Sequence, residues 1–325
     1  MDEMPIRRLG RSDLRVSAMS LGSWQTFEQL PREVGLATMR AAREQGITFL
    51  DDARYDDRTG TAPLPTGYSE VVFGELFRAA GWRREDVVVA NKLWLEFWPR
   101  EDLAAELDGS LGRLKLDYLD LEYCAPPPDG LTVEALVGQV GALIASGKLR
   151  AWGVLNWPAA QIAEAAEAAA RIGAPTPCAA QLAYSLARRS TVEDAEMQRV
   201  CEAAGVGVVA SATLAGGVLS GKYRRPGETG RLAGQLDDPR QQAAVAVADG
   251  LQQVAGELGV APASLAIAYA LANPLVASVL FGATRPEQVA QNVESLGVLP
   301  RLTEPVLERL RTLAPPTSPP TQARG

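Results

Sequence analysis

The sequence predicts an α/β fold, a (β/α)8 TIM barrel, and three observations lead to that prediction. Eight short runs of β-branched and aliphatic residues alternate with stretches that are rich in alanine and leucine and have helical periodicity. The length of 325 residues suits one large barrel. No G-x-G-x-x-G stretch follows the first run, which disfavours the alternative of a doubly wound sheet.

Each predicted strand is followed by a predicted helix, which is the repeating unit of a barrel. The strands are expected at 16–22, 47–53, 86–93, 118–124, 150–156, 179–185, 206–213 and 277–283. The helices are expected at 31–45, 69–80, 100–113, 132–146, 159–172, 191–204, 262–273 and 286–296. We therefore expect residues 1–314 to form a single barrel domain.

Four segments lie outside this repeat. Residues 7–17 are expected to form a small hairpin that closes the bottom of the barrel. The long stretches 54–67 and 223–239 follow strands, so a barrel places them at its C-terminal face, where functional loops gather. The final "PPTSPPTQARG", residues 315–325, is proline-rich and is expected to be a disordered tail.

The composition narrows the class of protein. The chain has 32 basic and 39 acidic residues and a net charge of −7, which argues against nucleic-acid binding. No apolar run approaches the length of about 18 residues that a membrane span needs, and the polar start lacks a signal-peptide core. Three unpatterned cysteines are typical of a reduced protein, so we expect a cytoplasmic protein without membrane attachment.

The chain contains no histidine. This excludes a Ser-His-Asp triad, a Cys-His pair and any histidine metal ligand. Carboxylates, lysine, tyrosine or cysteine must carry any acid–base chemistry. We predict no metal site.

Polar residues end several of the predicted strands. Asp51 and Asp52 end the second, Lys92 ends the third, Asn156 ends the fifth and Gln181 lies in the sixth. Strand ends converge in a barrel, so Asp51 and Lys92 are predicted to pair in one cavity. A lysine beside a carboxylate can tune a tyrosine or act as a base, but a structural ion pair at the rim remains an equal alternative.

Two glycine-containing segments could receive an anion. "GGVLSGKY" (216–223) has the glycine–lysine spacing of an ATP-binding loop, but Tyr223 stands where a magnesium-binding serine or threonine is needed, which excludes that site. Its glycines could still let backbone N–H groups approach a phosphate, or could simply make a flexible loop. "FGATRPEQVAQN" (281–292) could bind an anion at a helix N-terminus, with an ordinary βα turn as the alternative.

Aromatic residues follow two of the predicted strands. Trp24 follows the first, and "KLWLEFWP" (92–99) carries three aromatics after the third. They could line an apolar substrate pocket at the mouth of the barrel or could be core packing.

In combination, these segments resemble the aldo-keto reductase family, most closely the branch with potassium-channel β subunits and bacterial oxidoreductases. The resemblance covers residues from about 7 to 297. The segments that carry it are "GSW" (22–24), "GITFLDDA" (46–53), "GYSE" (67–70), "NKL" (91–93), "LDYLDLEYC" (116–124), "GVLNW" (153–157), "QLAYSL" (181–186), "LAGGVLSGKY" (214–223) and "GATRPEQVAQN" (282–292).

The resemblance implies that NADPH lies extended across the barrel mouth. The positions that match the cofactor-binding pattern of the family are Gly22, Ser23, Trp24, Asn156, Gln181, Ser211, Leu214, Ala215, Gly216, Lys222, Arg231, Gly282, Thr284, Gln288, Gln291 and Asn292. Among them, Asn156 and Gln181 match residues that bind the carboxamide, and residues 214–216 match the loop around the pyrophosphate. Ser211 stands where the family usually has an aromatic residue.

The resemblance also implies hydride transfer to a carbonyl, with Tyr55 as proton donor and with Lys92 and Asp51 as its helpers. In "DDARY" the tyrosine follows Asp51 after four residues, whereas the family has five, and Tyr68 is a second candidate. The family histidine aligns with Ala125. Such a loss costs roughly 10²–10³ in rate by analogy with oxyanion-hole deletions.

Three hypotheses follow. The first is an NADPH-dependent oxidoreductase that reduces a small-molecule aldehyde or ketone. The second is an NADP(H)-binding sensor or partner protein with little catalysis, as Ala125 and Ser211 suggest. The third is a barrel enzyme without redox chemistry, since one fold hosts many reactions.

Overall fold

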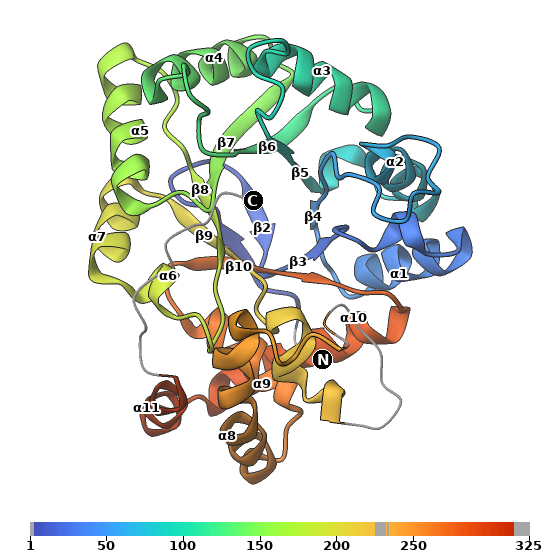
Figure 1. Cartoon of the computed structure of the whole chain (residues 1–325), viewed down its shortest axis with the longest axis vertical. Coiled ribbons are helices and arrows are strands. Elements are labelled where there is room, and N and C mark those ends of the chain that lie inside the picture. The colour runs from blue at the N-terminus through green and yellow to red at the C-terminus, as the bar shows by residue number, and fades with distance from the viewer. Residues whose placement is uncertain (1–2, 225–231, 233, 315–325) are drawn as a thin grey trace.

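The computed structural model describes residues 3–224, 232 and 234–314, and its centre is a closed barrel. Eight parallel strands pair in the order β10-β3-β4-β5-β6-β7-β8-β9. Helices surround them, and in the view down the molecule each lies outside the ring of strands (Figure 1). The predicted (β/α)8 barrel is confirmed.

The barrel strands agree closely with the predicted runs. Seven of the eight both start and end within about two residues of the prediction, as expected for strand boundaries read from sequence. Their bounds are β3 (Met19–Gly22), β4 (Phe49–Asp51), β5 (Val88–Leu93), β6 (Leu119–Cys124), β7 (Leu149–Leu155), β8 (Ala179–Ala183), β9 (Gly207–Ser211) and β10 (Val276–Gly282).

The prediction of a single strand over 16–22 was wrong. Arg15–Ser17 forms β2, which pairs with β1 (Ile6–Arg8), and only Met19–Gly22 enters the barrel. The side chain of Ser17 explains the break, because its hydroxyl donates to Met19 O at 2.6 Å and accepts from the N–H groups of Thr48 and Phe49. Local side chain–backbone bonds of this kind compete with regular strand pairing.

Eight predicted helical stretches are confirmed, with 191–204 divided into two helices. The helices are α1 (Arg32–Glu44), α2 (Tyr68–Ala80), α3 (Leu103–Leu114), α4 (Val133–Ala145), α5 (Ala159–Ile172), α6 (Ser190–Glu193), α7 (Ala195–Ala204), α8 (Gln242–Leu258), α9 (Pro262–Ala272), α10 (Pro286–Val293) and α11 (Glu304–Leu313). The 3₁₀ turns are η1 (Phe27–Gln29), η2 (Arg84–Asp86), η3 (Ala215–Ser220), η4 (Lys222–Arg224), η5 (Pro239–Gln241) and η6 (Glu294–Arg301). The helices α8 and α11 are additions to the predicted repeat.

Helix ends in this chain follow simple capping chemistry. Asp102 and Thr132 accept hydrogen bonds from backbone N–H groups at the starts of α3 and α4. Gly81 and Gly173 adopt left-handed backbone angles just after α2 and α5, which glycine does without steric cost. These capping residues mark where α3 and α4 begin and where α2 and α5 end.

Side chains on β6 alternate between the inside and the outside of the barrel. Leu121 and Tyr123 belong to the inner apolar cluster with Phe49 of β4, whereas Cys124 belongs to the layer between strands and helices. Glu122, between them in sequence, is fully buried. The alternation predicts that Glu122 faces the helices and that Ala125 follows on the inner side.

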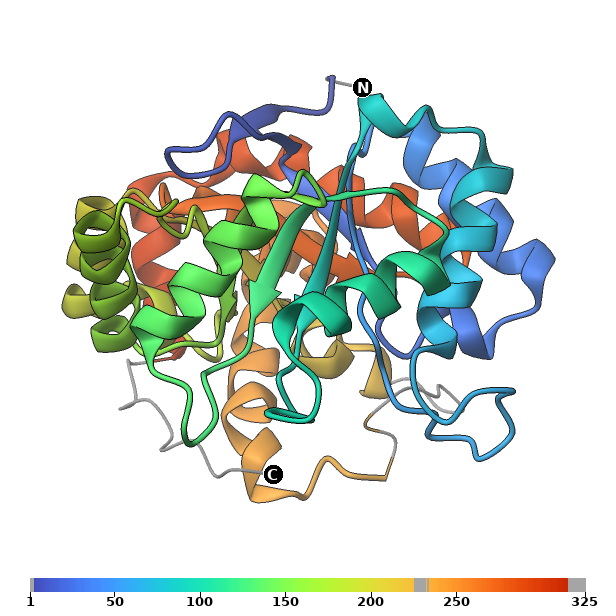
Figure 2. The ribbon, with the colours of Figure 1, turned by 90° about the horizontal axis from the view of Figure 1, so that it is seen from above.

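The β1–β2 hairpin covers one end of the barrel, as predicted. Figure 2 shows it at the end opposite the long loops that follow the strands. Gly10 makes the close approach possible: a Cβ there would lie 2.2 Å from the carbonyl oxygen of Cys178, and its φ of +56° favours glycine. The hairpin therefore seals the N-terminal end and leaves the C-terminal end for function.

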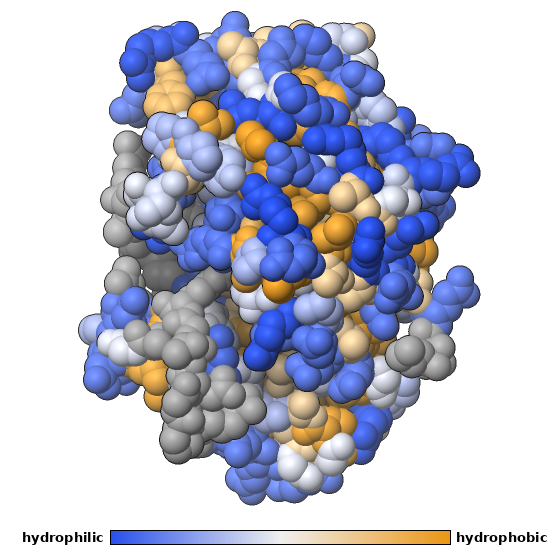
Figure 3. All heavy atoms as spheres, turned by 90° about the vertical axis from the view of Figure 1, so that its right-hand side faces the viewer, coloured by the Kyte–Doolittle hydropathy of each residue, from blue (hydrophilic) through white to orange (hydrophobic). Residues whose placement is uncertain are grey.

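The helices present mainly polar side chains to the outside of the molecule. The face that carries α1 and α2 is mostly hydrophilic, with small apolar areas between polar side chains (Figure 3). Within the described residues no single helix is long and apolar enough to cross a membrane, and α8 and α9 reach that threshold only as a pair bent by 95°. The predicted tail, 315–325, lies outside the described residues.

Candidate active site

The predicted ion pair between Asp51 and Lys92 forms at the C-terminal end of the barrel. Asp51 ends β4 and Lys92 lies near the end of β5, and both are almost fully buried. Lys92 Nζ lies 2.5 Å from Asp51 Oδ1 and 3.2 Å from the hydroxyl of Tyr55. It also donates to the backbone oxygen of Asp52 at 3.1 Å. One ammonium group thus joins a carboxylate and a phenol.

Further hydrogen bonds hold the two carboxylates in place. Gln181 Nε2, on β8, donates to Asp51 Oδ2 at 2.8 Å. Ser23, after β3, donates through its hydroxyl to Asp52 Oδ1. Burial raises the pKa of the Asp52 carboxyl well above its usual range, with a contribution from Glu70. Burial therefore favours the protonated form of Asp52, whereas Asp51 balances the charge of Lys92.

Burial and pairing oppose one another at Lys92. Burial alone would lower the pKa of the ammonium, but attraction to Asp51 and Tyr55 outweighs it and the pKa is raised. Burial raises the pKa of the Tyr55 hydroxyl as well, despite the opposing effect of Lys92. At neutral pH the site accordingly holds a charged lysine beside a protonated phenol, which can donate its proton.

The loop after β4 presents Tyr55, not Tyr68, to Lys92. Tyr55 is fixed through its backbone, since its N–H donates to Ser69 Oγ at 3.3 Å and its carbonyl accepts from Gly67 N at 2.9 Å. Tyr68 starts α2, and its hydroxyl accepts from Arg32 at 2.9 Å. The spacing of four residues after Asp51 therefore still brings a tyrosine to the lysine.

Ala125, which the resemblance aligns with the family histidine, lies close to the end of β5. Ala125 directly follows β6, is buried, and donates its N–H to Leu93 O at 2.8 Å. Trp94, which follows β5, packs against the inner cluster that contains Leu155, and its ring centroid lies 6.1 Å from that of Tyr55. The indole N–H of Trp94 has no hydrogen-bond partner in the described part of the chain. Tyr55 thus faces an apolar wall.

The residues predicted to bind a carboxamide lie at adjacent strand ends. Asn156 follows β7 in a left-handed conformation, φ +53°, which asparagine tolerates better than most residues. Its Oδ1 accepts from Ala183 N at 3.1 Å, so the side chain is pinned to β8 beside Gln181. Ser211 ends β9, and its carbonyl accepts from Tyr184 N at 3.0 Å. These predicted positions are brought together.

The predicted phosphate loop is a tight turn rich in left-handed residues. Ala215, Gly216 and Gly217 have φ values of +47°, +66° and +96°. A Cβ on Gly216 would lie 2.5 Å from Leu232 Cδ1, and one on Gly217 would lie 2.5 Å from Lys222 Cε. The missing side chains at Gly216 and Gly217 therefore let Leu232 and Lys222 pack against the backbone of the turn, and Lys222 adds a positive charge beside it. Leu214 precedes the turn, while Arg231 lies outside the described residues.

The positions predicted for the adenosine end lie at the end of β10 and on α10. Thr284 N and Thr284 Oγ1 both contact Gln288 Oε1, at 2.7 and 3.2 Å. Gln291 accepts through its carbonyl from Ser264, and Asn292 is buried. Gly22 and Gly282 are register partners on neighbouring strands. Trp24 is 44% exposed beside this end, with the Arg58 guanidinium 6.0 Å from its ring centroid.

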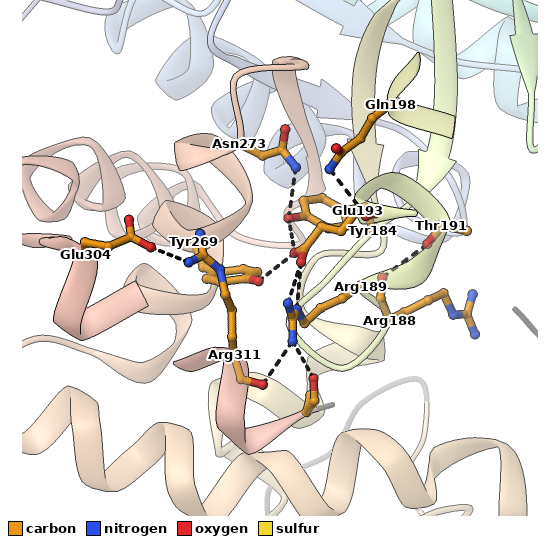
Figure 4. Close-up of polar contacts among 11 residues, drawn as sticks. Tyr184, Arg188, Arg189, Thr191, Glu193, Gln198, Tyr269, Asn273, Glu304 and Arg311 are labelled. Atoms are coloured by element: carbon orange, nitrogen blue, oxygen red, sulfur yellow. Dashed lines mark hydrogen bonds and ion pairs between the residues drawn. The ribbon is translucent and has the colours of Figure 1, made fainter. Parts of the chain in front are cut away.

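A buried polar cluster under the loop after β8 was missed by the sequence analysis. Glu193 accepts from the hydroxyls of Tyr184 and Tyr269 at 2.8 and 2.6 Å and from Arg189 at 2.6 and 2.9 Å (Figure 4). Burial works against the charge, but the bond from Arg189 keeps the pKa of Glu193 below its usual value. The i, i+4 spacing of Arg189 and Glu193 was an available signal.

This Glu193 cluster connects the site to the end of α11. The guanidinium of Arg189 also donates to the carbonyls of Arg311 and Ala314, at 2.9 and 2.8 Å (Figure 4). Tyr184 lies three residues after Gln181 and donates its N–H to Ser211. The cluster therefore supports the strand ends at which the predicted carboxamide-binding positions lie.

Comparison with known proteins agrees with this architecture. The model of the family described as "Aldo/keto reductase family" matches residues 18–314. A protein of Oryza sativa subsp. japonica named "Probable voltage-gated potassium channel subunit beta" is 35% identical over 328 residues, which covers 95% of this chain and 96% of the relative. A protein of Arabidopsis thaliana with the same name is 33% identical, over 94% of this chain and 95% of the relative.

The match to the family model spans the whole barrel, from β3 to the end of α11. The two relatives are aligned over nearly their entire lengths, so the similarity extends well beyond a shared core. The chain belongs to the aldo/keto reductase family.

Proposed function

We propose that this protein is an NADPH-dependent oxidoreductase that reduces the carbonyl group of an aldehyde or ketone. The observation that carries the proposal is the position of Lys92 Nζ between Asp51 and the hydroxyl of Tyr55, at 2.5 and 3.2 Å. The arrangement supplies a proton donor, a cation to stabilise its anion, and a carboxylate to hold the cation. A rim ion pair with a purely structural role would not require the phenol.

The residues around the barrel mouth fit NADPH. In the glycine turn at 215–217 the N–H groups of Ala215 and Gly217 already donate to Ala212 O and Leu214 O, at 2.8 and 2.9 Å. The Gly216 N–H and the ammonium of Lys222 beside the turn are the groups that would meet a phosphate. Asn156 and Gln181 offer amide groups at neighbouring strand ends. Thr284 and Gln288 mark the opposite end of an extended path. The three cysteines are buried and unpaired, which is compatible with the reducing cytoplasm that the sequence predicts.

When bound, NADPH would supply a hydride to the carbonyl carbon. Tyr55 would donate its hydroxyl proton to the carbonyl oxygen, which carries the developing negative charge. The ammonium of Lys92, 3.2 Å away, would stabilise the phenolate that remains. Asp51 would keep the lysine charged and oriented, and Gln181 would keep Asp51 in place.

The surroundings of Ala125 indicate the kind of substrate. Trp94 packs against the inner apolar cluster that contains Leu155, and Trp24 and Phe97 are exposed large apolar side chains on the loops after β3 and β5. With Ala125 in place of a polar residue, the indole N–H of Trp94, unpartnered within the described residues, is the second donor beside Tyr55, and its largely apolar surroundings favour a substrate with a bulky apolar group. Tyr55 is then the principal hydrogen-bond donor to the carbonyl oxygen.

A single-turnover measurement tests this proposal. Purified protein is mixed with NADPH and then with a panel of aldehydes, ketones and keto-sugars, and oxidation of the nicotinamide is followed by absorbance. We expect oxidation with wild-type protein and at least a hundredfold slower oxidation with Tyr55→Phe, at unchanged NADPH affinity. The matched control is Tyr68→Phe, which removes a hydroxyl bound to Arg32. Equal rates for wild type and Tyr55→Phe would contradict the assignment of the proton donor.

The second candidate function is an NADP(H)-binding sensor or partner protein with little catalysis. Ala125 in place of a polar donor favours it, and two relatives are named as probable channel β subunits. Tight binding of NADPH without oxidation by any carbonyl of the panel would favour this function over the first. Absence of NADPH binding would contradict both.

A further inference from the structure

A second candidate site lies at the opposite end of the barrel. A cavity of about 530 Å³ lies between the β1–β2 hairpin, the end of α7 and the connection from α9 to β10. Its volume is within the range of roughly 300–1,000 Å³ that is typical of small-molecule sites. Among the described residues, its lining contains three arginines, Arg7, Arg8 and Arg11, and one acidic residue, Glu202. We call it the basic cavity.

Close packing of the hairpin creates this cavity and fixes one of the arginines. Arg11 N donates to Gly205 O at 2.8 Å, and the Arg11 side chain lies over Gly205, where a Cβ would come within 2.3 Å of it. Arg11 Nη2 reaches Glu202 O at 3.3 Å. The absence of a side chain at residue 205 therefore gives this guanidinium its place.

The other two arginines are also held by backbone oxygens. Arg7 Nη1 donates to Val276 O at 2.8 Å and to Leu271 O at 3.3 Å, while Arg8 Nε donates to Ser12 O at 2.7 Å. A guanidinium has five N–H donors, so most of those around the cavity remain for another acceptor. The bonds orient the groups without neutralising them.

No carboxylate neutralises these charges. None of the ion pairs found among residues 3–224, 232 and 234–314 involves Arg7, Arg8 or Arg11. Arg8 also lies directly opposite Arg15 in the hairpin register, a like-charge pair that destabilises a strand pair. Burial lowers the pKa of Arg7, as expected for a cation without a counter-charge. This concentration of positive charge stands out in a chain of net charge −7.

We propose that the basic cavity binds a small organic phosphate, at the end of the barrel opposite Tyr55 and Lys92. Three guanidiniums against one carboxylate leave an excess of positive charge that a phosphate dianion would neutralise. Guanidinium groups match phosphate oxygens in geometry and form charge-assisted hydrogen bonds with them. The apolar portions of Leu275 and Val276 would face the organic part of the ligand.

Calorimetric titration with inorganic phosphate, at constant ionic strength and with chloride as the reference anion, tests this site. Wild-type protein should bind phosphate saturably, and Arg11→Gln should bind it about tenfold more weakly, as expected for the loss of one charge-assisted bond. Arg40→Gln is the matched control, because Arg40 is exposed and also makes one long backbone contact, to Ala79 O at 3.2 Å. It should bind phosphate as wild type does.

Lys222→Gln separates this site from the cofactor loop at the other end. Phosphate affinity unchanged in Lys222→Gln supports the basic cavity, whereas a loss in that variant, with Arg11→Gln unaffected, overturns it. Absence of saturable binding to wild type, or an equal loss in Arg40→Gln and Arg11→Gln, also overturns it. The outcome does not depend on whether the protein turns over a carbonyl.

A measurement on the unaltered chain keeps the proposal testable if Arg11→Gln fails to fold. Phenylglyoxal modifies accessible arginines, and mass spectrometry locates the modified residues. Phosphate should slow modification of Arg7, Arg8 and Arg11 severalfold relative to Arg40. Equal rates with phosphate and with chloride would refute binding in this cavity.

Discussion

Gln181 Nε2 donates a hydrogen bond to Asp51 Oδ2 at 2.8 Å, across the mouth of the barrel. The other oxygen of the same carboxylate accepts from Lys92, so Asp51 links a predicted cofactor-binding amide to the proton-donating pair. A carboxylate that uses both oxygens in this way has one orientation available to it. The proposed cofactor binding and the proposed proton donation thus depend on the same side chain.

Asp51→Asn should destabilise the fold by about 3–5 kcal/mol, because it leaves the buried ammonium of Lys92 without a counter-charge. Urea unfolding at pH 7 measures the change. Asp108→Asn is the control, since its ion pair with Lys148 is about half exposed and should contribute less than about 1 kcal/mol. Equal losses in the two variants would show that burial does not determine the strength of the Asp51 pair.

Ala125→His should raise the rate of carbonyl reduction, by up to about 10²–10³, because it restores a polar donor to the carbonyl oxygen beside Tyr55. Single-turnover oxidation of NADPH measures it. Ala125→Leu, which adds bulk without a donor, is the matched control and should not accelerate the reaction. A rate in Ala125→His no higher than in wild type would mean that Trp94 and Leu155 leave no room for a productive imidazole.

Gly216→Ala should weaken NADPH binding about tenfold or more, because the residue has φ +66° and the new Cβ would lie 2.5 Å from Leu232 Cδ1. Fluorescence titration with NADPH measures the affinity. Gly112→Ala is the control: residue 112 lies within α3 and a Cβ there meets no atom within 4 Å. Unchanged affinity in Gly216→Ala would exclude this turn from the cofactor site.

Glu122→Gln should stabilise the protein increasingly as the pH rises. Glu122 is fully buried and neither carboxyl oxygen has a partner within the described residues, so burial, reinforced by Glu106 and Glu70, raises its pKa well above 4.5. The folded state then holds a proton that the unfolded state releases. The contribution of Glu122 to wild-type stability is fully present below pH 4.5 and is lost as the pH rises toward its folded pKa, by up to about 1.4 kcal/mol per pH unit.

The amide in Glu122→Gln does not ionise and removes this dependence. Urea unfolding of both proteins at pH 5, 6, 7 and 8 should therefore show a difference that widens with pH. Glu164→Gln, on the exposed face of α5, should leave the pH profile of wild type unchanged. A constant difference between wild type and Glu122→Gln across this range would contradict the account.

The barrel was predictable because its signals are local. Buried parallel strands are short apolar runs, and glycines such as Gly81 and Gly173 mark where helices end. The helix α8 was missed because its alanines, valines and glutamines follow a long polar loop and are not preceded by a predicted strand. The strand boundary at Ala18 was missed because it depends on the hydroxyl of Ser17, which contacts residues about thirty positions away in the sequence.

The centre of the candidate site was predictable for the same reason, since Asp51 and Lys92 lie at the ends of recognisable strands. The Glu193 cluster was not, because it joins Tyr184 to Tyr269 and to the end of α11, segments that are distant in sequence. The lack of a partner for Glu122 also escapes sequence reasoning. The alternation of side chains along β6 predicts which side of the barrel wall Glu122 faces, but not which groups surround its carboxyl.

Arg189 holds the end of α11 through backbone carbonyls, not through side chains. Any amino acid offers the same carbonyl oxygen, so residues 311 and 314 are free to vary without loss of this attachment, whereas residue 189 is not. We therefore expect the sequence of α11 to vary among relatives, while the position of this helix against residue 189 is retained. A domain fused after residue 314 would therefore be attached at a fixed position, beside the loop after β8.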